Sequence, residues 1–308
     1  MAGWAPADMP DLNGTRALVT GANSGLGLQT SLELARRGAY VLLGCRDSDR
    51  AARARDEIAS SVPAAALEIL PLDLADLSSV REAAARVVGD DSRLDVLVNN
   101  AGVMAIPRRT TVDGFEMQLG TNHLGHFALT GLVLPALLRR PGARVVTLSS
   151  IVHRRGRIDI DDLMGETRYS AQGAYGQSKL DNLLFAAELD RRARAAGADL
   201  LSVAAHPGYA ATNLQSVGPA MSGNRLLGGM MKVGNALVAQ SDAAGAWPTE
   251  YAATMPDVTS GEYFGPGGPA ELRGHPRRAS RSAAAADLAM AGRLWTASER
   301  LTEVTYAF

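Results

Sequence analysis

The sequence predicts a doubly wound α/β fold, in which helices cover both faces of a mostly parallel sheet of seven strands. Short runs rich in Val, Leu and Ile alternate along the chain with segments of helical spacing. Nearly continuous apolar strands are typical of a parallel sheet buried on both faces. Strand–helix alternation favours right-handed crossovers. The expected strands are residues 17–20, 40–44, 67–72, 94–99, 143–149, 199–205 and 262–265.

The segments between these strands carry helical patterns. Leu28, Leu32 and Ala35 recur at i, i+4 and i+7, and residues 180–187 repeat leucine and alanine on one face. Residues 117–138 contain no Asp, Glu, Lys or Arg and reach the length of a membrane span. Because this stretch contains Asn, Gln, His and Pro, we interpret it as a helix buried in the protein.

Length and composition exclude several classes of protein. The chain has 308 residues, 46% of them apolar, which suits one large domain with its own core. Its net charge of -1 argues against nucleic-acid binding. Cys45 is the only cysteine, and the histidines lack metal-ligand spacing, so we expect neither a disulfide nor a metal site. The N-terminal residues show no signal peptide or anchor, which predicts a cytoplasmic protein without a stable membrane anchor.

The last third of the chain departs from the strand–helix alternation. Residues 213–260 are rich in Gly and Met, and form either a helix pair on the sheet edge or, as we prefer, a substrate lid, because Met adapts to varied shapes. Residues 266–308 form a C-terminal extension. Its basic part, 266–282, predicts a solvated loop, and 283–304 predict a helix with Leu288 and Trp295 on its buried face.

A glycine-rich loop joins the first strand to the first helix. Glycine permits positive φ and a close approach of the backbone. The helix N-terminus then offers free N–H groups and partial positive charge to a pyrophosphate. In this strand–loop–helix context the loop predicts dinucleotide binding rather than only a tight turn. The residues expected at the pyrophosphate are Gly21, Asn23, Ser24, Gly25, Leu26 and Gly27.

The loop spacing GxxxGxG and three later motifs resemble the short-chain dehydrogenase/reductase family. The later motifs are Asn99-Asn100-Ala101-Gly102, Tyr175-Gly-Gln-Ser-Lys179 and Pro207-Gly208. The resemblance covers roughly residues 12–265 and implies a single-domain Rossmann fold over 1–308. The sequence TNHLGHF at 121–127 and a long insertion between Ser150 and Tyr175 are similar to the retinol dehydrogenase-like and protochlorophyllide reductase-like group.

The end of the second strand bears on the choice of cofactor. An acidic residue there binds the ribose 2′-OH of NAD, whereas arginine holds the 2′-phosphate of NADP. We interpret Asp47 as a helix cap and Arg46 as the phosphate ligand, so we expect NADP, with NAD as the alternative. The resemblance implies that the remaining cofactor contacts are Asp73, Leu74, Asn100, Ala101 and Gly102 at the adenosine, and Pro207, Gly208 and Thr212 at the nicotinamide.

Tyr175 and Lys179 lie four positions apart on a predicted helix, so their side chains share a face. An ammonium about 4 Å from the phenol contributes about 4 kcal/mol at an effective dielectric of about 20, enough to lower its pKa by about three. The pair would then exchange a proton with a carbinol oxygen, and Lys179 can also bind the ribose hydroxyls. By resemblance, Ser150 polarises the substrate oxygen and Asn122 holds a water that bridges to Lys179.

These features predict an NADP-dependent oxidoreductase that transfers hydride between the nicotinamide and a carbonyl or alcohol carbon of a hydrophobic small molecule. The resemblance also implies a homodimer or homotetramer formed by helices at 112–138 and 173–197. Three alternatives remain: a cofactor-sensing protein without turnover, a carbon–carbon double-bond reductase, and a membrane-anchored retinoid-type enzyme. The double-bond reductase is associated with a cysteine acid near the substrate, and Cys45 lies at the adenosine end.

Overall fold

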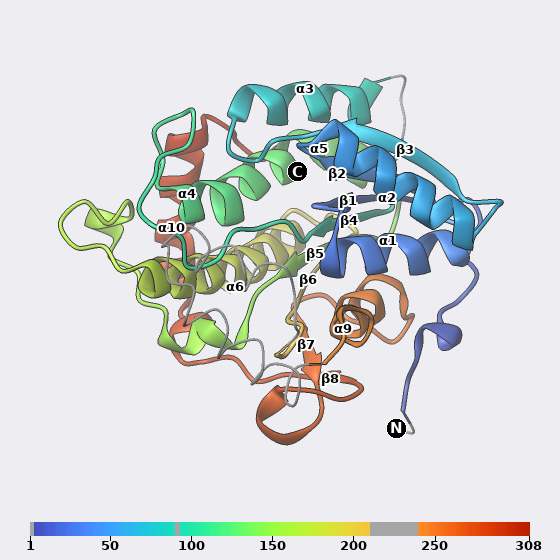
Figure 1. Ribbon diagram of the computed structural model, residues 1–308. Coiled ribbons are helices and arrows are strands. Elements are labelled where there is room, and N and C mark those ends of the chain that lie inside the picture. The colour runs from blue at the N-terminus through green and yellow to red at the C-terminus, as the bar shows by residue number, and fades with distance from the viewer. Residues whose placement is uncertain (1–2, 90–92, 210–239) are drawn as a thin grey trace, which may run out of the picture.

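The fold is organised around one eight-stranded sheet with the order β3-β2-β1-β4-β5-β6-β7-β8 (Figure 1). The computed structural model describes residues 3–89, 93–209 and 240–308. Strands β1 to β7 run parallel, and β8 pairs antiparallel with β7. The strands are β1 Arg16–Thr20, β2 Tyr40–Cys45, β3 Ala66–Pro71, β4 Val96–Asn99, β5 Ala143–Leu148, β6 Leu200–Ala205, β7 Tyr263–Pro266 and β8 Pro276–Arg278.

The sheet has one strand more than the seven expected. Strand β8 lies within residues 266–282, for which we predicted a solvated loop, and it forms a hairpin with β7. Pro276 is tolerated because β8 is an edge strand, where a missing N–H donor breaks no ladder bond. Arg277 and Arg278 are exposed on it, as suits an edge that must not pair with another chain.

Helices cover both faces of the sheet, which confirms the predicted α/β architecture (Figure 1). Along β1, Ala17 and Val19 pack in the core shared with α1, α2 and α9, whereas Leu18 packs in the core shared with α3 and α5. This alternation is the reason that β1 reads as a continuous apolar run. The helices are α1 Gly25–Arg36, α2 Ser48–Ser61, α3 Leu77–Val88, α4 Met117–Leu119, α5 Gly125–Leu138, α6 Ala171–Ala195, α9 Asp242–Thr254 and α10 Leu288–Thr302.

The strand order reverses direction at β1, which lies between β2 and β4. In open α/β sheets, ligands bind in the crevice beyond the carboxyl ends of the strands at such a switch point. The loops that follow β1, β2, β3 and β4 therefore meet at one edge. Most of the predicted site residues stand in these loops.

The apolar segment 117–138 is buried, as predicted, but a π-helical turn at Gly120–Leu124 separates α4 from α5. Within the described ranges, no helix has the length and apolar character needed to cross a bilayer. The expected lid falls largely on residues 210–239, which lie outside the described residues. Its remainder includes α9, which packs on α1 and the sheet.

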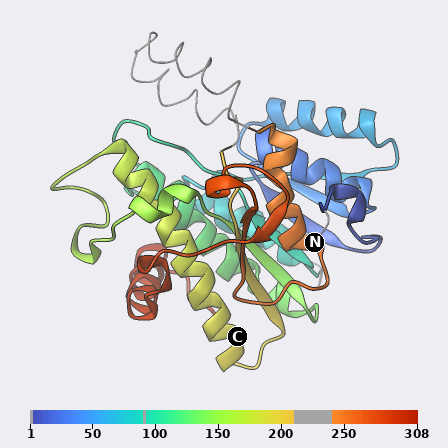
Figure 2. The same cartoon turned by 90° about the horizontal axis from the view of Figure 1, so that it is seen from below.

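The C-terminal helix α10 packs against α6, one of the helices expected to form a subunit interface (Figure 2). Trp295 is buried among Phe127, Phe185 and Tyr306, with ring centroids 5.0, 5.8 and 4.4 Å from its own. Leu288, which we placed on the buried face, is 58% exposed because it stands at the first turn of the helix, at the edge of this contact.

Replacing Trp295 with alanine is expected to lower the free energy of unfolding by about 3–5 kcal/mol, because it leaves a cavity in an aromatic cluster that holds α10 on α6. Urea denaturation followed by circular dichroism measures this loss. Thr296→Ala, on the exposed face of the same helix, serves as the control and should change stability by less than about 0.5 kcal/mol. Equal stability of the two variants would contradict the packing argument.

Candidate functional site

A cavity of about 330 Å³ opens at the carboxyl ends of β1 to β4, at the switch point of the sheet. It brings together every residue predicted to contact the pyrophosphate and the adenosine. Of the described residues predicted at the nicotinamide and the reacting carbon, none is among its walls. The cavity is lined by Thr20, Gly21, residues 23–27, residues 44–47, Arg50, residues 72–74, residues 100–103 and Thr121.

The glycine loop is shaped by close backbone contacts. Gly21 and Gly25 have φ of 67° and 55°, a region that side chains disfavour. A Cβ on Gly27 would stand 2.4 Å from the carbonyl oxygen of Gly21, so only glycine lets α1 begin this close to the strand. Ser24 is the N-cap residue of α1, yet its side chain makes no capping hydrogen bond. It lines the cavity with the helix N-terminus behind it, an arrangement that fits a pyrophosphate.

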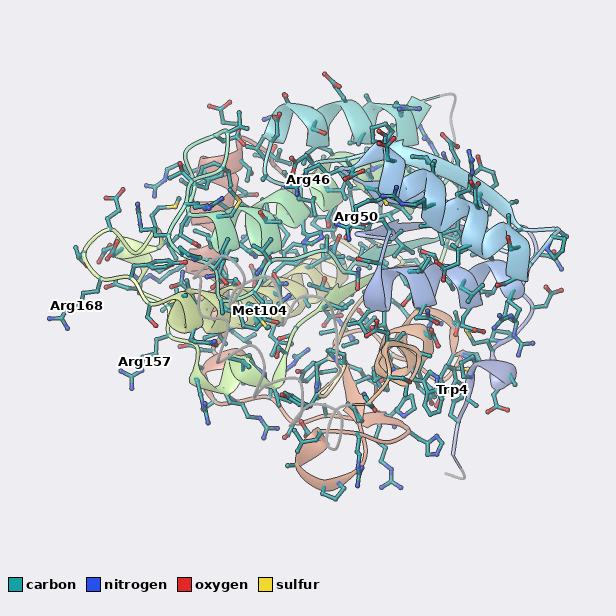
Figure 3. All side chains as sticks on the ribbon, in the orientation of Figure 1. Trp4, Arg46, Arg50, Met104, Arg157 and Arg168 are labelled. Atoms are coloured by element: carbon teal, nitrogen blue, oxygen red, sulfur yellow. The ribbon has the colours of Figure 1, made fainter. Side chains whose placement is uncertain are left out.

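At the end of β2, Asp47 caps helix α2, as predicted, by accepting a hydrogen bond of 2.9 Å from the backbone N–H of Arg50. Asp47 lines the cavity as well, and Arg50, in the first turn of the capped helix, lines it beside Arg46 (Figure 3). The Arg46 guanidinium is 72% exposed and lies 3.9 Å from a carboxylate oxygen of Asp73. Sequence reasoning missed Arg50; its place in the first turn of the capped helix was the available signal.

Cys45 also lines this cavity and is 3% exposed. Burial raises the pKa of its thiol to about 11, so it remains protonated at neutral pH. Cys45 stands at the end of β2, whereas Tyr175 lies on α6.

Ser150, Tyr175 and Lys179 converge beyond the carboxyl end of β5. Ser150 follows β5, and the other two lie on α6, so the 153–172 insertion does not separate them. All three are at least nine-tenths buried. The Ser150 hydroxyl lies near enough to Tyr175 to lower the pKa of its phenol. The ammonium of Lys179 donates to the carbonyl oxygen of Leu148 at 3.3 Å and lies 5.7 Å from the centroid of the Tyr175 ring.

The acidity of Tyr175 differs from our expectation. Burial raises the pKa of Tyr175 to about 12, and the nearby Ser150 hydroxyl, which lowers the pKa, only partly opposes this. Burial also lowers the pKa of Lys179 to about 8. We predicted that Lys179 would lower the pKa of the phenol, but both groups lie in the interior, where loss of hydration disfavours each charged form. The phenol is therefore a protonated donor at neutral pH.

Asn122 stands in the π-helical turn and is fully buried. Its Oδ1 accepts from the N–H of Val103 at 2.8 Å, and its Nδ2 donates to the carbonyl oxygen of Val103 and to Ser178 Oγ, each at 2.9 Å. The amide thus clamps the loop after β4 to α6. A Cβ on Gly102 would lie 2.9 Å from Asn122 Oδ1 and 3.6 Å from Lys179 Nζ, so the loop, the amide and the ammonium meet closely.

His126 connects this turn to Thr20, which lines the cavity. Its Nε2 lies 2.8 Å from Thr20 Oγ1, and its Nδ1 lies 2.9 Å from the carbonyl oxygen of Asn122. Thr20 Oγ1 in turn accepts from the N–H groups of Asn100 and Ala101, each at 2.9 Å. His126 is 1% exposed and, like His123, is buried on its helix, as expected.

The segment predicted at the nicotinamide continues from β6. Gly208 has φ of 66°, and a Cβ there would stand 2.4 Å from the carbonyl oxygen of Leu272. Tyr209 donates its N–H to the same oxygen at 2.8 Å. The Pro207–Gly208 turn is therefore packed against the C-terminal extension. Thr212 lies outside the described residues.

Comparisons with known proteins agree with this geometry. Residues 15–221 match the sequence profile of the family described as short chain dehydrogenase. Human retinol dehydrogenase 13 is 40% identical over 305 residues, which cover 97% of this chain and 88% of the relative. An uncharacterized protein from Mycobacterium paratuberculosis has a crystal structure that covers 100% of both chains with 44% identity and a TM-score of 0.82.

A second solved structure is described as an NAD(P)-dependent gluconate 5-dehydrogenase from Beutenbergia cavernae with bound NADP at low occupancy. It is 27% identical and covers 79% of this chain and 91% of its own, with a TM-score of 0.61.

The comparisons correct one expectation. We predicted a cytoplasmic location from the N-terminal sequence. The relatives matched over most of the chain are retinol dehydrogenases, which are membrane-associated enzymes, and this overturns that prediction.

The buried histidines predict a loss of stability in acid. Burial lowers the pKa of His123 to about 3 and that of His126 to about 4. Below an unfolded pKa of about 6.5, the unfolded chain binds protons that the folded chain does not, so stability falls as the pH decreases. Each imidazole should reduce the free energy of unfolding by up to about 2 kcal/mol between pH 7 and pH 5.

Urea denaturation of the wild type and of His123→Gln at both pH values tests this. The variant should lose less stability on acidification than the wild type. An equal loss in both proteins would show that His123 does not contribute.

Proposed function

The chain belongs to the short-chain dehydrogenase family, and from that premise we propose that it transfers a hydride between NADP and the carbonyl or alcohol carbon of an apolar small molecule. Membership of the family and the retinol dehydrogenase relatives make it an oxidoreductase of alcohol and carbonyl groups. The proposal adds the roles of single residues, the choice of NADP and the class of substrate, and it takes residues 1–308 as one catalytic domain.

The observation that carries the proposal is the buried contact of Ser150, Tyr175 and Lys179 beyond β5. NADPH, when bound, supplies the hydride. In reduction, the Ser150 hydroxyl donates a hydrogen bond to the substrate carbonyl oxygen, and the protonated phenol of Tyr175 gives its proton to that oxygen. Lys179 supplies positive charge beside the phenolate that this transfer leaves. Asn122 holds the loop after β4 against α6, which supports this arrangement.

The choice of NADP rests on Arg46 and Arg50. Both line the end of the cavity beyond β2, and Asp47 between them is committed to capping α2. Two guanidinium groups suit the ribose 2′-phosphate. The bound NADP of the Beutenbergia cavernae relative supports the same choice.

The choice of an apolar substrate rests on the relatives. Human retinol dehydrogenase 13 is named for retinol, an apolar alcohol, and it matches 97% of this chain. We retain a substrate lid at 213–260 as part of the proposal. A homodimer or homotetramer is likewise proposed, and it would have to use faces of α5 and α6 that α10 leaves uncovered.

Replacing Tyr175 with phenylalanine should lower kcat for carbonyl reduction by about 10²–10⁴-fold, because the proton donor is lost, while the dissociation constant for NADPH stays unchanged. Steady-state kinetics on a panel of aldehydes and fluorescence titration measure the two quantities. Tyr40→Phe, on an exposed tyrosine at the start of β2, is the matched control and should retain full activity. Full turnover by the Tyr175 variant would refute the assignment.

Replacing Arg46 with alanine should weaken NADPH binding by about 10–100-fold, because a charged hydrogen bond to the 2′-phosphate is lost, and should leave NADH binding almost unchanged. Isothermal titration calorimetry with both nucleotides tests this. Arg53→Ala, on the exposed side of α2, is the control. Equal losses for NADPH and NADH, or tighter binding of NADH by the wild type, would contradict the proposed specificity.

A further inference from the structure

The C-terminal extension reaches the same edge of the sheet as the predicted nicotinamide segment. The loop between β7 and β8 contributes the carbonyl oxygen of Leu272, which accepts from the N–H of Tyr209 and stands against Gly208. This loop belongs to a region that the sequence predicted to be solvated. Its contacts instead place it beside the turn that follows β6.

Glu271, next to Leu272, joins three separate segments. Its Oε2 accepts from Arg154 Nη2 at 2.9 Å, and Arg154 lies four residues after Ser150. The same oxygen lies 3.4 Å from His206 Nε2, at the end of β6. Its Oε1 accepts from the N–H and the hydroxyl of Ser280, at 3.3 and 3.2 Å. One carboxylate therefore links the segment after β5, the segment after β6 and the extension itself.

His206 lies between Glu271 and the Pro207–Gly208 turn, which is predicted to contact the nicotinamide. It is fully buried, and its Nδ1 accepts from the N–H of Gly208 at 3.2 Å. A neutral imidazole that accepts at Nδ1 carries its proton on Nε2, the atom that faces Glu271. A Cβ on Gly265 would stand 1.9 Å from Nε2, so β7 also confines the ring.

The backbone at Glu271 is held in a costly conformation. Ala270 and Glu271 have φ of 52° and 57°, in the left-handed region that residues with a Cβ disfavour. Such strain persists where surrounding contacts over-determine it, and it concentrates at functional sites. Here the contacts that hold it are those of the Glu271 carboxylate and the Leu272 carbonyl.

His153 also connects the extension to Ser150. His153 is 1% exposed. Its Nδ1 lies 2.7 Å from the carbonyl oxygen of Ser150, and its Nε2 accepts from the N–H of Ser282 at 3.3 Å. Ser280 and Ser282, in the segment after β8, thus reach Glu271 and His153 respectively.

We infer that Glu271 is a positioning residue for the nicotinamide end of the cofactor: through His206 and Arg154 it holds the Pro207–Gly208 turn and the segment after Ser150 in fixed relation. The inference rests on the proposed function, because it takes that turn as the nicotinamide contact. Glu271 touches neither Tyr175 nor the adenosine cavity in the contacts described. Its removal should therefore affect one end of the dinucleotide and leave the other unchanged.

The test compares two ligands on matched variants. Glu271→Ala should bind NADPH about tenfold more weakly than the wild type, because the nicotinamide turn loses its support. It should bind 2′,5′-ADP, which lacks the nicotinamide, with unchanged affinity. Glu262→Ala is the control. It removes the ion pair between Glu262 and Arg278 on the same β7–β8 hairpin, and in the contacts described Glu262 touches neither His206 nor Arg154. It should bind both ligands as the wild type does.

Equal NADPH affinity in the two alanine variants would overturn the inference, and so would an equal loss for NADPH and 2′,5′-ADP, which would indicate a general structural defect. Should Glu271→Ala fail to fold, Glu271→Gln keeps the side-chain volume and carries the same expectation with a smaller loss. A wild type that binds neither ligand refutes the proposed NADP specificity instead. In that case NADH and AMP replace the two ligands, and the same comparison decides the role of Glu271.

Discussion

One buried hydroxyl, that of Thr20, connects the parts on which the site depends. It accepts hydrogen bonds from two backbone N–H groups of the loop after β4 and meets the His126 ring, which also contacts the carbonyl oxygen of Asn122. The end of β1, the loop after β4 and the π-helical turn are thereby held together. Since an unpaired buried polar group is costly, each member of this network restrains the others. The glycine loop begins one residue after Thr20, so the hydrogen bonds of Thr20 also fix the position of the loop that lines the cavity.

Burial also sets the acidity of Tyr175, the proposed proton donor. The spacing of Tyr175 and Lys179 suggested an acidic phenol, yet loss of hydration outweighs the attraction between the two groups and raises the pKa of the phenol to about 12. A phenol that keeps its proton at neutral pH is matched to carbonyl reduction, in which it must donate. Positive charge from an oxidised nicotinamide would favour the phenolate of Tyr175, whereas burial favours the neutral phenol. The bound cofactor and the protein would therefore have opposite effects on the protonation of Tyr175.

The C-terminal extension is part of the architecture of the site. Helix α10 covers α6, the helix that carries Tyr175 and Lys179, and it is anchored by Trp295 in an aromatic cluster. The β7–β8 hairpin packs against the turn after β6, where Leu272 bonds the N–H of Tyr209 and Glu271 faces His206. Residues far along the chain thus support both sides of the proposed catalytic site.

The sequence by itself determined seven of the eight strands and most residues that line the cavity, because these depend on local signals. The continuous apolar strands, the GxxxGxG loop and the Asp47 cap can be predicted because residues close in the sequence determine their backbone geometry. What only the tertiary structure decided depends on partners distant in sequence. Strand β8 is too short and too polar to show a period. That Arg50 lines the cavity depends on how α2 packs beside the ends of the other strands. The acidity of Tyr175 depends on how completely the fold removes water from Tyr175 and Lys179.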